Sequence, residues 1–194
     1  MTETISIIAG LFNVLAGSSY LKQVVKNEST PNPTTWVIWL VVTIINSTTY
    51  FSIVGNKWIA LSSAVTAIMV FLIFVLSLFK GKFTKLNKID IASLILAVFI
   101  GIFWQISGNA VISNISLQAV FIISFYPTIH GLLIGVSKEN YFAWSMGCCS
   151  YVLQIFNIFL NPITIVALAF PVIQLLGQGY IAVLAYRKSS SIIH

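Results

Sequence analysis

The sequence predicts an all-α membrane protein with seven transmembrane helices. Of its 194 residues, 58% are hydrophobic and only 7% are charged, whereas roughly 25% of residues are charged in an average soluble domain. The mean hydropathy is +0.99. The charged residues leave five long uncharged runs, three with room for one helix of about 20 residues and two with room for two. These helices account for nearly the whole chain, which leaves no length for a separate soluble domain.

The seven spans follow from these runs and from two turn signals. Ser107-Gly108-Asn109 divides one long run, and Asn161-Pro162 divides the other. The predicted spans are residues 5–25, 35–54, 58–79, 91–106, 111–136, 141–160 and 163–186. A β-barrel would need short segments that alternate apolar and polar residues, but residues 68–76 are apolar at every position.

The basic residues predict how the spans are oriented. Only Lys57 falls on the side of the N-terminus, whereas nine fall on the side of the C-terminus: Lys22, Lys26, Lys80, Lys82, Lys85, Lys88, Lys138, Arg187 and Lys188. Because basic loops stay in the cytosol, we expect a multi-pass protein of the cell membrane with an outside N-terminus and a cytosolic C-terminus. The net charge of +6 then reflects topology, and no nucleic-acid partner is expected.

An internal repeat relates the first three spans to the last three. Residues 18–21 resemble residues 124–127, and each segment precedes a short polar loop and then a tryptophan, Trp36 or Trp144. From these tryptophans an offset of 108 pairs Asn46 with Gln154, Thr49 with Asn157 and Thr66 with Gln174. The match needs a gap of two residues between tyrosine and tryptophan. One span between two units of three keeps both units parallel, so we expect two three-helix bundles (1–80 and 109–188), a linker helix with its basic loop (81–108) and a tail (189–194).

This plan resembles the SWEET and PQ-loop transporters in their full-length 3+1+3 form. The segment Ser124-Phe125-Tyr126-Pro127-Thr128, followed by Ser137-Lys138-Glu139 and by Trp144, is similar to the PQ-loop motif. Thr128 stands where that motif has glutamine, and in the first copy Leu21 and Lys22 replace the proline and the glutamine. The resemblance implies a SWEET-like carrier fold without naming a substrate. The candidate gating residues are Tyr20, Tyr126 and Pro127, with Pro127 as a flexible point because proline removes a helical hydrogen bond.

Polar side chains inside the apolar spans are the candidate binding residues, because each costs free energy in a bilayer unless it is partnered or hydrated. They are Asn46, Thr49, Thr66, Gln154, Asn157, Gln174 and Gln178. Several of them lie three or four residues apart, which places them on one helix face. We therefore expect them to line a shared cavity; the alternative is hydrogen bonding between helices.

The same residues predict the kind of solute. No predicted span holds a carboxylate in its interior, so an ammonium group would lack a countercharge, and amides and hydroxyls suit a neutral, sugar-like solute. We expect alternating-access uniport by facilitated diffusion. His130 is a candidate proton site, although a hydrogen-bonded wall residue is the simpler interpretation. The alternatives are a PQ-loop-type or PnuC-type carrier of an amino acid or vitamin, proton-coupled through His130, and a receptor that does not transport, since the KDEL receptor resembles this fold.

Other function classes lack their residues. A retinal protein needs a lysine within the last span, and residues 163–186 have none. Neither a Gly-x-Ser-x-Gly nor a His-Glu-x-x-His motif occurs, so no enzyme is expected. Adjacent Cys148 and Cys149 point to different helix faces, and neither a metal nor a cofactor is expected. The expected partners are a small-molecule substrate and the lipid bilayer, with a homo-oligomer left open.

Overall fold

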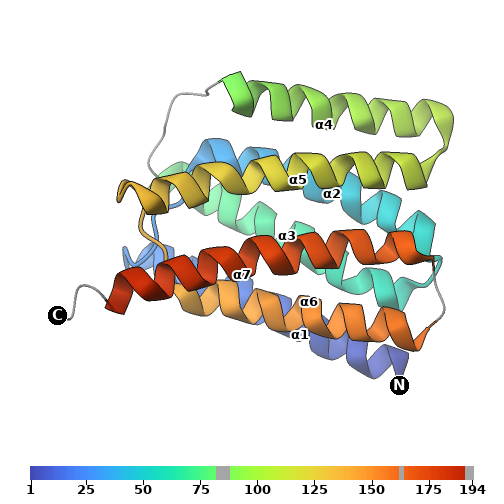
Figure 1. Ribbon diagram of the computed structural model, residues 1–194, viewed down its shortest axis with the longest axis horizontal. Helices are drawn as coiled ribbons and strands as arrows, with labels where there is room; N and C mark the ends of the chain where they lie inside the picture. Colours follow the sequence, from blue (N-terminus) through green and yellow to red (C-terminus); the bar gives the residue numbers. More distant parts are fainter. Residues whose placement is uncertain (82–87, 162–163, 191–194) are drawn as a thin grey trace.

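The computed structural model describes residues 1–81, 88–161 and 164–190, and within them all regular structure is helical (Figure 1). The elements are α1 (Thr2–Val25), α2 (Pro33–Val54), α3 (Lys57–Lys80), α4 (Lys88–Ser107), α5 (Ala110–Leu133), α6 (Tyr141–Leu160), the 3₁₀ helix η1 (Ile165–Leu168) and α7 (Ala169–Ser190). The predicted start of the last span at Ile163, two of the basic residues, Lys82 and Lys85, and most of the predicted tail lie outside the described residues.

The membrane class is confirmed for six helical segments. α1, α2, α3, α5, α6 and the segment Ile165–Ser190 are each long and apolar enough to cross a bilayer, whereas the apolar part of α4, Ile91–Ser107, is shorter. Large apolar side chains cover the outside of the bundle; Ile68, Phe99 and Leu176 are each more than half exposed. Such a surface is unfavourable in water and suits contact with lipid tails.

Local sequence sets where the helices begin and end. Asn32, Asn56, Asn109 and Asn140 precede α2, α3, α5 and α6, and each side chain accepts a hydrogen bond from a backbone N–H in the first turn. α5 ends at Leu133, three residues before the predicted end of that span. Gly135 follows with a φ of +78°, a left-handed conformation that a right-handed helix cannot contain.

α4 lies at one edge of the helix bundle (Figure 1). We call α1, α2 and α3 the first group of helices and α5, α6 and α7 the second group. In the first group α3 contacts both α1 and α2, and in the second α7 contacts both α5 and α6. The groups meet where α1 packs on α6 and α2 packs on α5, while α4 packs on α5 and α2. We call the end of the bundle that holds residues 26–32 and 134–140 the loop end, and the opposite end the N-terminal end.

The helix boundaries repeat at a constant spacing. Ala110 begins α5, Tyr141 begins α6 and Ile165 begins η1, each 108 residues after the start of α1, α2 or α3 (110 − 2, 141 − 33 and 165 − 57). The two-residue gap in the tyrosine–tryptophan alignment is therefore not needed. By helix position Tyr126 corresponds to Ser18 and not to Tyr20.

Candidate functional site

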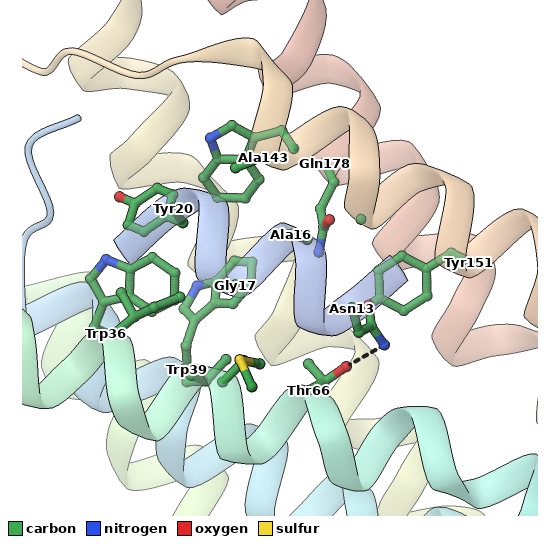
Figure 2. A pocket seen from close by; sticks show the side chains of 15 residues that line it. Asn13, Ala16, Gly17, Tyr20, Trp36, Trp39, Thr66, Ala143, Tyr151 and Gln178 are labelled. Carbon is green, nitrogen blue, oxygen red and sulfur yellow. Dashed lines mark hydrogen bonds between the residues drawn. The ribbon is translucent and has the colours of Figure 1, made fainter. Parts of the chain in front are cut away.

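A cavity of about 70 Å³ lies between the two groups of helices, lined by side chains from α1, α2, α3, α6 and α7 (Figure 2). Ligand pockets usually measure roughly 300–1,000 Å³, so this cavity is smaller than a usual ligand site. The polar lining side chains are Asn13, Tyr20, Thr66, Tyr151 and Gln178, and no lysine, arginine, aspartate or glutamate is among the lining residues.

The polar wall lies near mid-bundle. The Asn13 amide donates to the Ser62 carbonyl and to Thr66 Oγ1, both at 3.1 Å. Gln178 Nε2 donates to Gln174 Oε1 at 3.3 Å. The Tyr151 hydroxyl lies near Thr66 and Gln178 but has no hydrogen-bond partner within the described residues. A buried polar group without a partner costs free energy, so a polar solute in the cavity would relieve that cost.

The wall toward the loop end is aromatic. Tyr20 packs against Trp36 and Trp144, with ring centroids 5.1 and 5.9 Å apart, and Trp39 lies edge-on to Trp144 at 6.3 Å. Trp39 Nε1 donates to the Ser124 carbonyl at 3.2 Å, which fixes its orientation. These rings give the wall toward the loop end an apolar surface, whereas the amides and hydroxyls make the mid-bundle wall polar.

Two glycines leave room for neighbouring side chains at the cavity. A Cβ at Gly17 would lie 2.6 Å from Met69 Sδ, and a Cβ at Gly147 would overlap Gln178 Oε1. Glycine at these positions lets Met69 and Gln178 approach the facing helices. The shape of the cavity thus depends on both glycines.

The seven predicted binding residues separate in the structure. Thr66 and Gln178 line the cavity, and Gln174 lies behind Gln178 as its hydrogen-bond acceptor. The other four, which lie nearer the N-terminal end of the bundle, take part in hydrogen bonds outside the cavity: Asn46, Thr49, Gln154 and Asn157.

One of these polar clusters joins α2 to α5. Asn114 Nδ2 donates to Asn46 Oδ1 and to Thr49 Oγ1, both at 3.0 Å. Gln118 Nε2 donates to Asn46 Oδ1 at 3.3 Å. All four side chains are buried, so this cluster fastens the first group of helices to the second.

A second polar cluster joins α1 to α6. Asn157 Nδ2 donates to Ser6 Oγ at 2.8 Å, and Thr2 Oγ1 donates to Asn161 Oδ1 at 2.9 Å. Gln154 Nε2 donates to Ser150 Oγ, which in turn donates to the Ala9 carbonyl at 2.8 Å. Both boundaries between the two groups are therefore fastened by hydrogen bonds on the N-terminal side of the cavity.

Among the predicted gating residues, only Tyr20 lines the cavity. Tyr126 is half exposed and stacks on the exposed His130, with ring centroids 5.4 Å apart. Pro127 lies within α5 and borders a second hollow, of about 270 Å³, at the loop end. The structure thus keeps Tyr126 and His130 away from the cavity.

Sequence reasoning missed two important polar residues. Asn13 has no polar partner in the repeat, so the matching positions give no signal for it. Glu139 lies in a loop by sequence, but its Oε1 accepts from the Tyr20 hydroxyl at 3.0 Å and its Oε2 accepts from Trp144 Nε1 at 3.1 Å. Its position directly before the helix cap Asn140, within reach of the first turn of α6, is the signal that points to this contact.

The environment of Glu139 changes its acidity. Burial raises the pKa of its carboxyl group from the ordinary 4.5 to about 7, against hydrogen bonds from Trp144, Tyr20 and Ser29 that lower it. A carboxylate desolvated in this way takes up a proton near neutral pH.

The two loops around Glu139 are tied to each other. Thr30 N donates to the Lys138 carbonyl at 2.9 Å, and Asn140 N donates to Ser29 Oγ at 3.2 Å. Asn140 Nδ2 donates to Glu28 Oε2 at 3.1 Å. The loop end is therefore closed by hydrogen bonds between equivalent loops of the two groups.

No family model, curated protein or solved structure compared with this chain matches it. Within the described residues, no group of three or more His, Cys, Asp or Glu side chains could hold a metal ion.

Proposed function

We propose that this protein is a membrane carrier that binds a small, neutral, polar solute in the central cavity and moves it by alternating access. The observation that carries the proposal is the placement of an unpartnered Tyr151 hydroxyl, among the described residues, in an uncharged cavity at the boundary between two groups of helices. Amides of Asn13 and Gln178 lie in the same wall. Hydroxyls and amides bind neutral polar groups, and the tryptophans suit the apolar face of a sugar-like ring.

The arrangement of the helices supports alternating access in a SWEET-like 3+1+3 fold. Corresponding helix pairs meet within and between the two groups, although more extensively in the first group, and α5, α6 and η1 start 108 residues after α1, α2 and α3. Carriers built from repeats bind their solute between the two units and rock one unit against the other. In this fold α4 is the connector that keeps the two units parallel. The excess of basic residues at the loop end supports a cytosolic location for the loop end.

The two ends of the cavity supply the contacts that alternating access must break. On the N-terminal side these are the clusters around Asn46 and Asn157, and on the loop side they are the contacts of Glu139. All of them are made in this structure, which in the proposed cycle is the arrangement of an occluded state. Opening one end at a time would enlarge the cavity and admit the solute.

Two alternatives keep the same site. One is a carrier of an amino acid or a vitamin. The other is a receptor that does not transport, which the small cavity of about 70 Å³ favours. Solute exchange separates carrier from receptor: purified protein is reconstituted in liposomes, and labelled sugars, amino acids and vitamins are tested after a thermal-shift screen for ligands that stabilise the protein. Exchange of a stabilising solute supports the carrier, whereas stabilisation without exchange contradicts it.

Tyr151→Phe is expected to weaken binding of the solute found in that screen by about 2- to 13-fold, which corresponds to the roughly 0.5–1.5 kcal/mol of one hydrogen bond. The phenyl ring keeps the packing and removes only the unpartnered hydroxyl. The measurement is the dissociation constant from thermal shift or calorimetry. Tyr126→Phe is the matched control and should bind normally, because Tyr126 lies outside the cavity. Equal effects of the two variants would argue against the assigned site.

A further inference from the structure

The carboxylate of Glu139 fastens the loop end of the cavity. Its two oxygens accept hydrogen bonds from Tyr20 on α1 and from Trp144 on α6, and both of these side chains line the cavity. α1 belongs to the first group of helices and α6 to the second. Glu139 therefore bridges the boundary that alternating access must open at this end.

Glu139 also lines a second hollow, which lies at the loop end of the bundle. Glu139, Pro127 and Trp36 line the hollow of about 270 Å³ at the loop end, and Trp36 also lines the central cavity. Glu139 thus stands between the cavity and the loop-end hollow. Separation of the loops would break its contacts with Tyr20 and Trp144 and expose the carboxylate to water.

The loops and helix ends near Glu139 in the sequence and at the loop end carry other titratable groups, and among them Tyr20 is the hydrogen-bond partner of the carboxylate within the described residues. On the neighbouring elements they are Tyr20, Lys26, Glu28, His130, Lys138 and Tyr141. Tyr20 is the one that donates to the carboxylate, and Glu28 accepts from Asn140. Lys26, His130, Lys138 and Tyr141 are exposed, so water screens their influence.

We propose that Glu139 is a proton-binding latch: the closed loop end holds one proton on this carboxyl group, and separation of the loops releases that proton to water. The proposal rests on the proposed function, because the latch acts on one of the two ends through which the carrier would load and unload. In the protonated closed form Oε2 still accepts from Trp144 Nε1, and the O–H at Oε1 donates to the Tyr20 hydroxyl across the same pair of atoms. On opening this O–H bond breaks, water accepts the proton, and the carboxylate remains. Solute release at the loop end is then linked to proton release there.

The direction of the pH effect follows from the environment of the group. In the closed form burial raises the pKa of Glu139 to about 7, whereas an exposed carboxyl group has the ordinary 4.5. The closed form binds the proton more tightly than the open form, so acid favours closure. Between those two values, each unit of pH changes the ratio of closed to open molecules by up to about tenfold.

Distances between spin labels on the two loops test this proposal without any solute. Labels are attached to Lys26→Cys and Lys138→Cys, both exposed positions, in a protein whose Cys148 and Cys149 are replaced with alanine. The short distance of the closed form should grow in population as the pH falls from about 8 to about 5. Glu139→Gln mimics the protonated group and should keep the short distance throughout this range.

Two further variants complete the experiment. Glu28→Gln removes the other loop carboxylate and should leave the pH response intact. Tyr20→Phe removes a hydrogen bond that lowers the pKa of Glu139, so it should move the midpoint to higher pH. A distance that is independent of pH in the native protein, an opposite response, an unchanged response in Glu139→Gln, or an unmoved midpoint in Tyr20→Phe would each overturn the latch. Failure to exchange any solute in liposomes would contradict the carrier and not the latch, because the labels report only the loops.

Discussion

Gly147→Ala is expected to weaken solute binding by at least about tenfold, which corresponds to roughly 1.4 kcal/mol. The added Cβ would overlap Oε1 of Gln178 and lie 3.1 Å from its Cδ. Gln178 must then leave its position in the cavity wall and lose its hydrogen bond to Gln174. The dissociation constant of the solute from the thermal-shift screen and its exchange rate in liposomes measure the effect.

The matched control for this substitution is Gly179→Ala on α7. The nearest atom to a Cβ at Gly179 is Cys148 Sγ at 3.8 Å, an ordinary packing distance. We expect this variant to bind and exchange the solute like the native protein. If the two alanine variants behaved alike, the position of Gln178 in the cavity would have no part in binding.

Asn114→Leu is expected to loosen the N-terminal end and to lower the stability of the protein. The substitution removes the hydrogen bonds to Asn46 and Thr49, each worth on average about 0.6 and at most about 1.7 kcal/mol between membrane helices. The total loss of about 1–3 kcal/mol falls on the contact between α2 and α5. Amide hydrogen exchange in these two helices should become faster, and the melting temperature should fall.

Ser113→Ala is the control for that experiment, because the Ser113 hydroxyl donates to the Asn109 carbonyl at the start of its own helix. Its exchange pattern should stay close to that of the native protein. Faster exchange confined to α6 and α7 in Asn114→Leu would contradict the assigned role of the α2–α5 cluster.

The helical membrane class could be predicted because its signals are local. Hydrophobic length identifies a membrane span without reference to the rest of the chain, and asparagine caps with glycine after the helix set the ends. The predicted span 141–160 has the bounds of α6 in the structure. The packing of the helices depends on residues far apart in the sequence. The only sequence signal for it is the offset of 108 residues between the two halves of the chain.

The candidate site was harder to predict because a polar side chain in a membrane helix can be satisfied in two ways, by a solute or by a side chain of another helix. Asn46 and Thr49 share a helix face that could meet a solute, but the same face meets Asn114 on α5. Asn114 lies in the first part of its span, where polar residues are inexpensive, so it gave no signal. Whether Asn46 faces a cavity or a partner depends on what another helix places at the same depth.

The two tyrosines of the repeat show how a small register difference changes a role. Successive residues turn by about 100° around a helix. Tyr126 occupies the position of Ser18, two residues before that of Tyr20, so it points to nearly the opposite side. Tyr20 is buried against the cavity, whereas Tyr126 is half exposed. The two tyrosine–tryptophan segments are similar in sequence, but Tyr20 and Tyr126 lie on different faces of their helices.

The tryptophans allow the cavity wall to be followed by intrinsic fluorescence. Three of its five tryptophans border the cavity, and Trp144 donates its indole N–H to a carboxylate. The other two, Trp58 and Trp104, lie at the N-terminal end, where Trp58 packs beneath Lys57. With Trp58 and Trp104 replaced by phenylalanine, the remaining emission comes only from the cavity wall. Its colour and intensity would then follow solvent entry and ring stacking in real time, in unlabelled protein.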